Sequence, residues 1–528
     1  SDKQIAEPLL FRLDALIDIG VEYLHLHRKT MSLSGGETQR VRLAKQLSSP
    51  LTEVLYILDE PSVGLHPHNL EQLFVMIRNL KEKGNTLVVI EHDLAFVTLA
   101  DHLIETGPGS GIEGGHILYS GPGSSISGAP ESQIKDYLSG EKTVPVPSYR
   151  RKSKSRFKVE NATLHNLRNF SCTIPLGSWT VVTGVSGSGK STLVFDLIET
   201  AVRKNLALKK NAGSRIVLPQ VTLSGIHSIT NVVTLDQKHT QITSRSDLST
   251  FVDLLTPLRI FYSSLPEAAR LGLGPRHFSF NSPSGMCKKC SGLGTITIDL
   301  LFLPQQQFPC GECKGKKLNA AALSIRYRDR SVGDILSLPV KSAYTLLADL
   351  PKPCRILESL LEVGLGYLTL GQPLQTLSGG ELARVKLALA LMKRSSKTTL
   401  FLFDEPTSGL SQNDIEVITT LLHKLVDRGN TLLMVEHNID MMCQADHIID
   451  LGPGGGEDGG TLIASGTPEE VASSPVSKTA PFLKSALSGI IGRAEELGSG
   501  HVFEPGQDRK VAALRNPLSG PDASSALL

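Results

Sequence analysis

A glycine-rich stretch, GVSGSGKST, runs from Gly184 to Thr192 and fits the pattern GxxxxGK[ST]. It lies between two apolar runs, WTVVT and LVFDLIETAV, so we expect a loop that joins a strand to a helix. In that setting backbone N–H groups and the helix N-terminus face phosphate oxygens. Lys190 is expected to reach the β and γ phosphates, and the Ser191 hydroxyl to bind Mg²⁺. The residues assigned to phosphate binding are Gly184, Ser186, Gly187, Ser188, Gly189, Lys190, Ser191 and Thr192.

Two acid pairs end apolar runs elsewhere: Asp59 and Glu60 end LYILDE, and Asp404 and Glu405 end LFLFDE. Carboxylates at the end of a buried strand are costly without a nearby cation. We therefore expect the aspartates to hold the magnesium shell and the glutamates to orient or deprotonate an attacking water. His92 and His437 follow the next apolar runs and are candidates for contact with the γ phosphate.

Four cysteines form two CxxC pairs, Cys287 with Cys290 and Cys310 with Cys313, separated by 19 residues. This spacing is typical of a structural four-thiolate Zn²⁺ site, and the intervening TITIDLLFL predicts the arms of a hairpin. Free thiols or a disulfide are the alternatives.

Residues 276 to 330 carry nine Lys or Arg against three acids. This excess of positive charge favours binding of a polyanion, although a solvated basic surface would have the same composition.

Four segments of the chain occur twice at an almost constant offset. MSLSGGETQRVRLAKQL (Met31 to Leu47) returns 344 residues later, and the segments with LDEP, IEH and GPGSGIEGG return after 345. The short apolar runs are rich in Leu and β-branched residues and do not alternate with polar ones, which predicts buried parallel strands. Helix-length segments, 69–83 and 413–427, separate them, so the repeat is predicted to be an α/β module covered on both faces.

The motifs LSGGE, DEP, EH and GVSGSGKST, in this order, resemble those of the ABC class of ATPases. The resemblance implies two nucleotide domains that meet head to tail, so that each site combines the phosphate loop of one with the LSGGE helix of the other. A second helix N-terminus could complete the cage around the γ phosphate. On this resemblance one site combines the phosphate loop and Gln237, Asp404, Glu405 and His437 with Ser34, Gly35 and Gly36.

Only one phosphate loop accompanies the two LSGGE motifs. The second site would use Asp59, Glu60, His92, Ser378, Gly379 and Gly380, with its phosphate loop upstream of Ser1 or on a separate polypeptide. The first residues show no initiating Met, and we expect truncation. The predicted fold is therefore α/β, with tandem ABC-type ATPase domains of which the first is partly present and the second carries an inserted zinc-binding module.

The chain also resembles the UvrA family, the damage-recognition ATPases of bacterial excinucleases. The segments RHFSFNSPSGMCKKCSGLG, LDQKHTQITSRSDLSTF (Leu235 to Phe251) and the paired GPGxGxxGG motifs carry this resemblance. It implies ATP, Mg²⁺ and Zn²⁺ as cofactors, no nuclease activity, and contact with duplex DNA around the zinc hairpin, where lesions are sensed as altered shape. The candidate phosphate contacts are Lys238, Arg245, Lys288, Lys289, Lys314 and Lys316. A homodimer and a UvrB-type helicase partner are implied for the full-length protein, but the helicase-docking region would lie upstream.

Some positions depart from the family pattern. ETQ after the first LSGG corresponds to ELA after the second, and Ser411 stands where the family usually has a histidine. These departures would suit a paralogue that protects drug-bound DNA instead of serving nucleotide excision repair. The ATPase subunit of a membrane transporter is a further alternative, against which the four cysteines and the tandem repeat argue. A binding module without turnover is the third.

Composition is that of a cytoplasmic globular protein of several domains. The 528 residues are 40% hydrophobic and 20% charged, and no apolar run approaches the roughly 18 residues that span a membrane. No secretory signal is apparent at the first residues. The expected division is 1–138 for the partial first domain, 139–157 for an exposed basic Pro/Ser linker, 158–484 for the second domain with an insertion at about 243–395, and 485–528 for a disordered tail.

Overall fold

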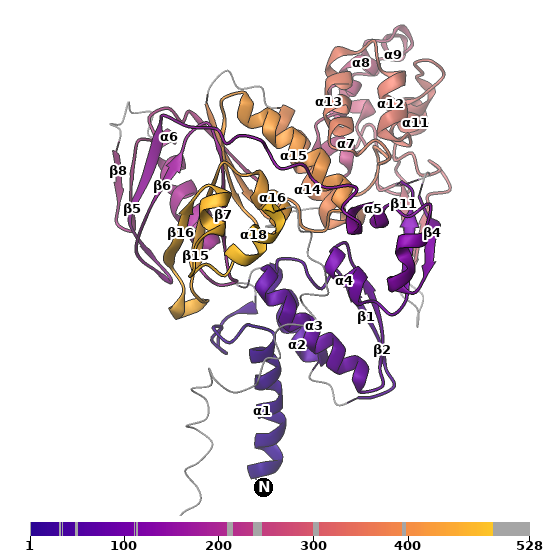
Figure 1. Ribbon diagram of the computed structural model, residues 1–528. Coiled ribbons are helices and arrows are strands. Elements are labelled where there is room, and N and C mark those ends of the chain that lie inside the picture. The colour runs from indigo at the N-terminus through magenta and orange to yellow at the C-terminus, as the bar shows by residue number, and fades with distance from the viewer. Residues whose placement is uncertain are drawn as a thin grey trace, which may run out of the picture.

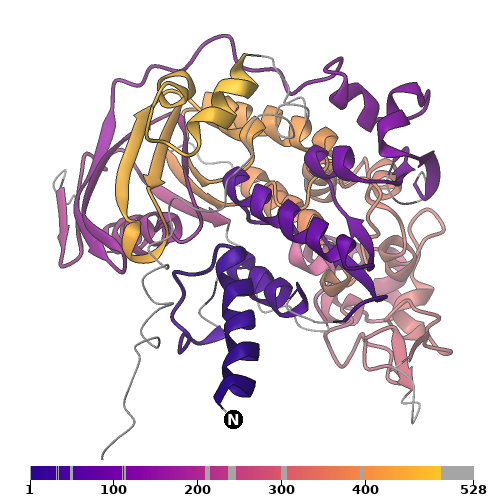
Figure 2. The ribbon, with the colours of Figure 1, turned by 60° about the horizontal axis from the view of Figure 1, so that its bottom comes forward.

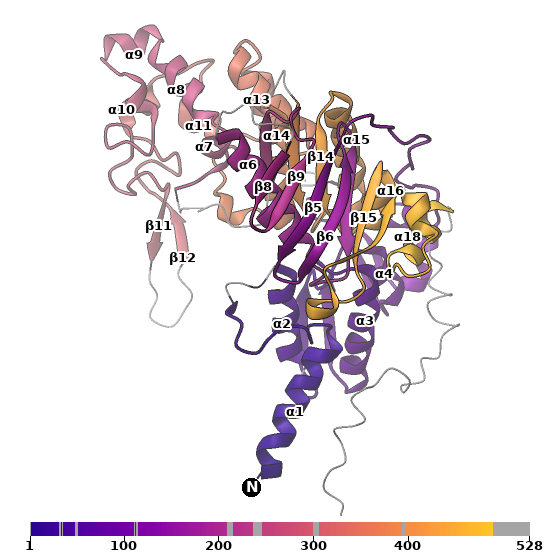
Figure 3. The same cartoon turned by 90° about the vertical axis from the view of Figure 1, so that its left-hand side faces the viewer.

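The computed structural model describes residues 2–30, 33, 35–47, 51–109, 111, 114–207, 215–235, 245–298, 306–392 and 398–488. In Figures 1 and 3, an N-terminal module lies beneath the sheets of a larger second module, and a group of short helices extends from the second module. Among the described residues, no helix is long and apolar enough to cross a membrane.

The centre of the second module is a six-stranded sheet. Its order is β10 (Asn231–Leu235), β13 (Thr399–Asp404), β14 (Thr431–Val435), β7 (Trp179–Gly184), β15 (His447–Gly452) and β16 (Thr461–Gly466). All neighbours are parallel except β15 and β16. Strand β7 thus lies in the middle, and the carboxyl ends of β7, β13 and β14 meet at one edge of the sheet.

Both faces of this sheet are covered. On one face, helices η4 (Thr192–Glu199) and α6 (Thr200–Ala207) share a core with an antiparallel sheet of β5 (Arg156–Leu164), β6 (Leu167–Pro175), β8 (Arg215–Leu218) and β9 (Val221–Ser224). On the other face lie α15 (Gln412–Asp427), α16 (Ile439–Gln444) and α18 (Ala480–Leu487). Helix α17 (Pro468–Ala472) connects β16 to α18. The predicted buried parallel strands are confirmed in this module.

The insertion is mainly helical and ends at the second LSGGE motif. Tyr262, Phe278 and Phe280 are buried in its core. Its antiparallel hairpin, β11 (Thr295–Ile298) with β12 (Gln306–Pro309), projects from the helices in Figure 3. The helical elements are α7 (Leu248–Phe251), α8 (Leu255–Ser263), α9 (Pro266–Arg270), η5 (Pro275–Phe278), α10 (Ala320–Ser324), α11 (Val332–Leu336), α12 (Val340–Leu346), α13 (Pro351–Glu362), η6 (Leu374–Thr376) and α14 (Gly379–Met392).

The N-terminal module contains two separate pairs of strands. Strands β1 (Leu55–Asp59) and β2 (Thr86–Ile90) are parallel, and β3 (Leu103–Gly107) and β4 (His116–Gly121) are antiparallel. The helical elements are α1 (Asp2–Asp18), α2 (Gly35–Leu47), α3 (Pro67–Glu82), α4 (Leu94–Leu99), η3 (Gly123–Gly128) and α5 (Ile134–Leu138). Figure 2 shows this module from below, with α1 pointing away from the rest of the chain.

The prediction that all four apolar runs are buried strands is wrong for this module. One face of β1 and β2 is covered, but Ile57 and Val88 on the other face are 64% and 48% exposed. Among the described residues, no strand lies between β2 and β3 at the position that β7 occupies between β14 and β15. Within the same part of the chain, no counterpart of η4 and its antiparallel sheet covers the exposed face either.

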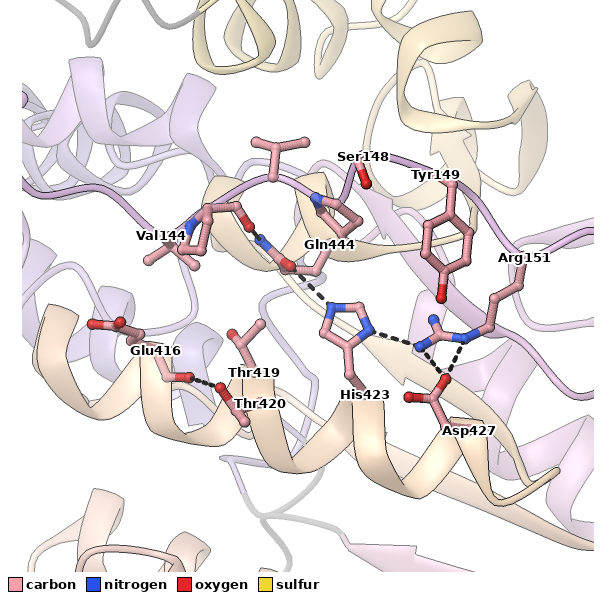
Figure 4. Close-up of a pocket in the computed structure, with 13 residues that line it drawn as sticks. Val144, Ser148, Tyr149, Arg151, Glu416, Thr419, Thr420, His423, Asp427 and Gln444 are labelled. Carbon is pink, nitrogen blue, oxygen red and sulfur yellow. Dashed lines mark hydrogen bonds and ion pairs between the residues drawn. The ribbon is translucent and has the colours of Figure 1, made fainter.

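The basic linker follows the surface of α15, and most of its residues are exposed. At one end Lys142 lies 3.6 Å from Glu416, and at the other Arg151 lies 2.6 Å from Asp427 and 3.2 Å from Asp446. Figure 4 shows the linker passing over α15, with a cavity of about 400 Å³ beneath residues 144–149. Asp446 also accepts a hydrogen bond from the Trp179 N–H at the start of β7, so the linker is joined to the strand that leads into the phosphate loop.

Candidate functional site

The GVSGSGKST loop connects β7 to the helix that follows it, as the sequence predicts. Gly184 has φ +131°, and a Cβ there would overlap the Leu451 carbonyl oxygen. The Lys190 ammonium is buried and donates to the carbonyls of Gly184 (2.8 Å) and Val185 (3.0 Å). Burial lowers the pKa of Lys190 to about 8, since removal from water disfavours its charge. An anion bound beside this ammonium would stabilise its protonated form and raise its pKa again.

The carboxylates at the end of β13 lie at the same sheet edge. Glu405 has a left-handed backbone, with φ +44°, and its Oε1 lies 3.5 Å from His437 Nε2. His437 is buried, and burial, together with the positive charge of Lys190, holds its pKa well below the usual range. The neutral imidazole can therefore accept or donate a hydrogen bond here without adding charge.

Buried polar atoms at this edge fit a bound nucleotide with Mg²⁺. Among the described residues, the Ser188 hydroxyl and His437 Nδ1 are buried and have no hydrogen-bond partner. Glu436 is fully enclosed, and burial next to Glu405 and Asp404 raises its pKa well above the usual range. Its carboxyl group contacts the Thr407 hydroxyl. Phosphate oxygens would satisfy the orphaned donors, and a divalent cation would offset the clustered carboxylates.

The N-terminal module contacts the phosphate loop directly through Tyr23. A Cβ on Gly187, Gly455 or Gly456 would lie less than 3 Å from the Tyr23 side chain, so the ring packs against Gly187 and Gly455 and the Tyr23 Cβ packs against Gly456. The Tyr23 hydroxyl donates to Glu37 Oε1 at 3.0 Å, near the start of α2. Helix α2 begins at Gly35 in the first LSGGE motif, so this motif and the phosphate loop belong to one composite region.

Two predicted members of this region, Ser34 and Gln237, lie outside the described residues. Gly35 and Gly36 form the first turn of α2. Arg40, one turn further, donates from Nη2 to the Tyr23 hydroxyl at 3.1 Å, and its charge contributes to lowering the pKa values of Lys190 and His437. Arg40 therefore lies near enough to Lys190 and His437 for its charge to disfavour theirs.

The predicted second half-site repeats this arrangement. His92 Nε2 lies 3.7 Å from Glu60 Oε1, and Glu60 has φ +45°, like its counterpart Glu405. Glu60 lies against Gly409, in the turn after the second Asp-Glu pair. Asp59 is exposed at the end of β1, and the motif Ser378, Gly379 and Gly380 begins α14.

A second tyrosine repeats the Tyr23 contact. Tyr367 packs on Gly111 and donates to Glu381 Oε1 at 2.7 Å, as Tyr23 packs on Gly456 and donates to Glu37. The two half-sites are therefore related by a pseudo-twofold arrangement of the repeats.

The four predicted zinc ligands converge at the base of the hairpin. Cys287, Cys290, Cys310 and Cys313 are buried, and all four sulfur atoms lie within 4.8 Å of one another. Two Sγ–Sγ distances are 3.9 Å (Cys287 to Cys310) and 3.7 Å (Cys290 to Cys313). These separations are too long for a disulfide. They match the edge of about 3.8 Å expected for four thiolates 2.3 Å from one Zn²⁺.

The predicted phosphate contacts divide into exposed and paired side chains. Arg245, Lys288, Lys289 and Lys314 are exposed, and Lys238 lies outside the described residues. Lys316 is 2.7 Å from Asp334, so its charge is partly satisfied within the protein. An open cavity of about 500 Å³, lined in part by Arg245 and Phe251, lies beside this basic surface.

Sequence reasoning did not identify Tyr23, Arg40 or His66 as site residues. The repeat carries the signal for the first two: GVEYLHL and GLGYLTL place Tyr23 and Tyr367 at the same offset as the LSGGE motifs, and Arg40 matches Arg384. His66 has no such signal because Ser411 stands at its repeated position. Its role depends on a contact across the two modules.

No protein-family model matches the chain. The chain is 44% identical to UvrABC system protein A of Thermus thermophilus over 474 residues, 89% of this chain and 49% of that protein. Identity to UvrABC system protein A of Methanothermobacter thermautotrophicus is also 44%, covering 92% of this chain and 50% of that protein. The chain thus spans about half the length of the curated relatives it matches.

The crystal structure of UvrA2 from Deinococcus radiodurans superimposes with a TM-score of 0.85 at 43% identity, over 92% of this chain and 58% of that one. Sequence and fold comparisons therefore both cover about nine-tenths of the chain. On these grounds the chain is a homologue of UvrABC system protein A and of UvrA2 over almost its whole length.

Proposed function

We propose that this chain hydrolyses ATP at the Lys190 site and couples hydrolysis to recognition of distorted duplex DNA in nucleotide excision repair. The main supporting observation is Tyr23, which links the first LSGGE helix to the phosphate loop of the second module. A nucleotide at Lys190 would therefore be held by both modules, and hydrolysis would change how they contact each other.

The proposed roles follow from position and charge. Lys190 and the loop amides would bind the phosphates, while Ser191 and Asp404 would hold Mg²⁺. Glu405 lies at the end of β13, 3.5 Å from His437, and would act as the general base or orient the water. Neutral His437 would contact the γ phosphate, and the Gly35–Gly36 turn would cap it from the other module. Ser34 and Gln237 are assigned by family resemblance alone.

The zinc module is the proposed DNA-contacting part. Four buried thiolates would fix the base of the β11–β12 hairpin, where Zn²⁺ would serve as a structural crosslink. Exposed Lys288, Lys289, Lys314 and Arg245 would contact phosphates, so binding would depend on shape more than on sequence. We also propose that the chain divides into a partial first domain (1–138), a linker (139–157) and a second domain (158–484).

Turnover of ATP tests the proposed reaction. Purified chain should release phosphate in the presence of Mg²⁺, and Glu405→Gln should lower kcat by about 100-fold or more while ATP still binds. Glu358→Gln, an exposed residue on α13, is the matched control and should retain full activity. An unaltered chain with no turnover above the Glu405→Gln level would contradict the proposal and favour a module that only binds.

DNA binding is tested separately by fluorescence anisotropy with a labelled duplex. Affinity should fall steeply between about 50 and 200 mM salt, because each phosphate contact releases counterions. Lys289→Ala should reduce the salt slope by about one, and Lys316→Ala should reduce it less because Asp334 already pairs with Lys316. Binding that is independent of salt would argue against the proposed DNA surface.

A further inference from the structure

The turn after the first Asp-Glu pair sends a buried histidine into the second module. His66 precedes α3, its side chain is fully buried, and its Nε2 lies 3.0 Å from Thr479 Oγ1. Its ring stands edge-on to His437, with centroids 5.9 Å apart. Burial, with a smaller contribution from Lys190, lowers the pKa of His66 to about 3, so the ring is neutral.

Hydrogen bonding along this contact has a defined direction. The His68 N–H donates to His66 Nδ1 at 3.2 Å, so the neutral ring carries its proton on Nε2. That N–H donates to the Thr479 hydroxyl, which in turn donates to Asp450 Oδ1 at 3.3 Å. Asp450 lies on β15 in register with Thr183, directly before the phosphate loop. A continuous polar path therefore runs from the first module to β15, the strand paired with the one that leads into the phosphate loop.

The repeated position in the other half-site has no equivalent path among the described residues. Ser411 replaces the histidine and bonds within its own module, accepting from the Asp414 N–H at 3.3 Å. Ile134 stands where the repeat has Thr479, and its side chain offers no hydrogen-bonding group. Asn413 makes the cross-module contact there instead, accepting from the Tyr137 hydroxyl at 2.8 Å. The His66 path is therefore specific to the site that holds the phosphate loop.

We propose that His66 is a positioning residue for the Lys190 site, acting through Thr479 and Asp450 to set the register of the first module's turn against the phosphate loop and His437. This inference rests on the proposed ATPase function. The path is satisfied only when both modules are in place, because separation would leave the His66 N–H and the Thr479 hydroxyl without each other. His66 would thus make the catalytic alignment of His437 depend on contact between the modules.

Steady-state hydrolysis of ATP by the whole chain tests this role. His66→Ser, which introduces the residue that the repeat has at 411, and Thr479→Val should each lower kcat about 10-fold and change KM for ATP less than about twofold, since misalignment affects the reacting geometry more than binding. The double variant should lose about 10-fold in total and not about 100-fold, because both changes break one path. His227→Ser and Thr420→Val, both exposed, are the matched controls and should keep full activity.

A loss of kcat in the double variant equal to the product of the two single losses would overturn the positioning role. A rise in KM with kcat unchanged would do the same. Neither result would contradict the proposed ATPase function. If the unaltered chain hydrolyses no ATP, the proposed function fails. Urea unfolding then tests the contact itself, on the unaltered chain, the two single variants and the double variant. Non-additive losses of the free energy of unfolding support the path, and additive losses refute it.

Discussion

The two Asp-Glu-His groups of this chain share one internal geometry and have different surroundings. His437 lies 3.5 Å from Glu405 and is 8% exposed, whereas His92 lies 3.7 Å from Glu60 and is 43% exposed. Both glutamates adopt the same left-handed backbone. The repeat thus preserves the local turn, but only one copy lies beside a phosphate loop and is closed off from water. Burial of His437, more than the motif itself, produces its lowered pKa, which suits phosphate chemistry.

The same difference extends through the strands that carry these groups. In β13 and β14, Leu402 and Leu433 are fully buried beneath η4 and the antiparallel sheet. Their repeated counterparts, Ile57 and Val88, are on the exposed face of β1 and β2. Similar apolar strands therefore form a packed core in one module and leave an exposed apolar face in the other.

Matched substitutions in these strands should give the largest difference. Leu402→Ala should lower the free energy of unfolding of the second module by about 2–5 kcal/mol through lost burial and a residual cavity. Ile57→Ala should change that of the first module by about 0.5 kcal/mol or less, because the side chain is already in water. Urea denaturation monitored by circular dichroism measures both. Equal losses would show that β1 and β2 are covered in solution.

Nucleotide affinity should show the next largest difference between the two half-sites. Isothermal titration with an ATP analogue is expected to give one site per chain, and Lys190→Ala should weaken it about 100-fold because a buried ammonium no longer faces the phosphates. The exposed Lys352→Ala variant on α13 serves as a control. A second site of similar affinity would show that the two half-sites do not differ in nucleotide binding.

Tyr23 and Tyr367 should show a smaller difference between the two half-sites. Tyr23→Ala should lower ATP turnover about 10-fold, because the ring supports Gly187 in the phosphate loop. Tyr367→Ala should lower it less than about threefold, although both variants lose a similar packing contact. Phosphate-release assays on the two variants, with unfolding curves as a check on stability, measure this difference. An equal loss of turnover would mean that Tyr23 acts only through stability.

Much of the site was predictable from the sequence because its residues lie in short motifs. The loop from Gly184 to Thr192 carries its strand–helix context with it, and two CxxC pairs indicate a four-thiolate cluster wherever they occur. Tyr23 and Arg40 could have been found from the repeat, but their function could not, because it depends on which loop of the other module they reach. The linker was predicted to be exposed, and most of its residues are, but Lys142 and Arg151 also pair with acids on α15 and with Asp446, which the composition did not indicate.

Residue types and spacing by themselves determined the α/β repeat, the phosphate loop, the paired carboxylates and the four thiols, since each depends on interactions within a few residues or on a fixed motif. The folded structure is needed to see which copy of the repeat is buried and which tyrosine supports the loop. It is also needed to see that His66 contacts Thr479, 413 positions away. These contacts join segments that are distant in the chain, and local sequence does not encode the energy of burial that distinguishes them.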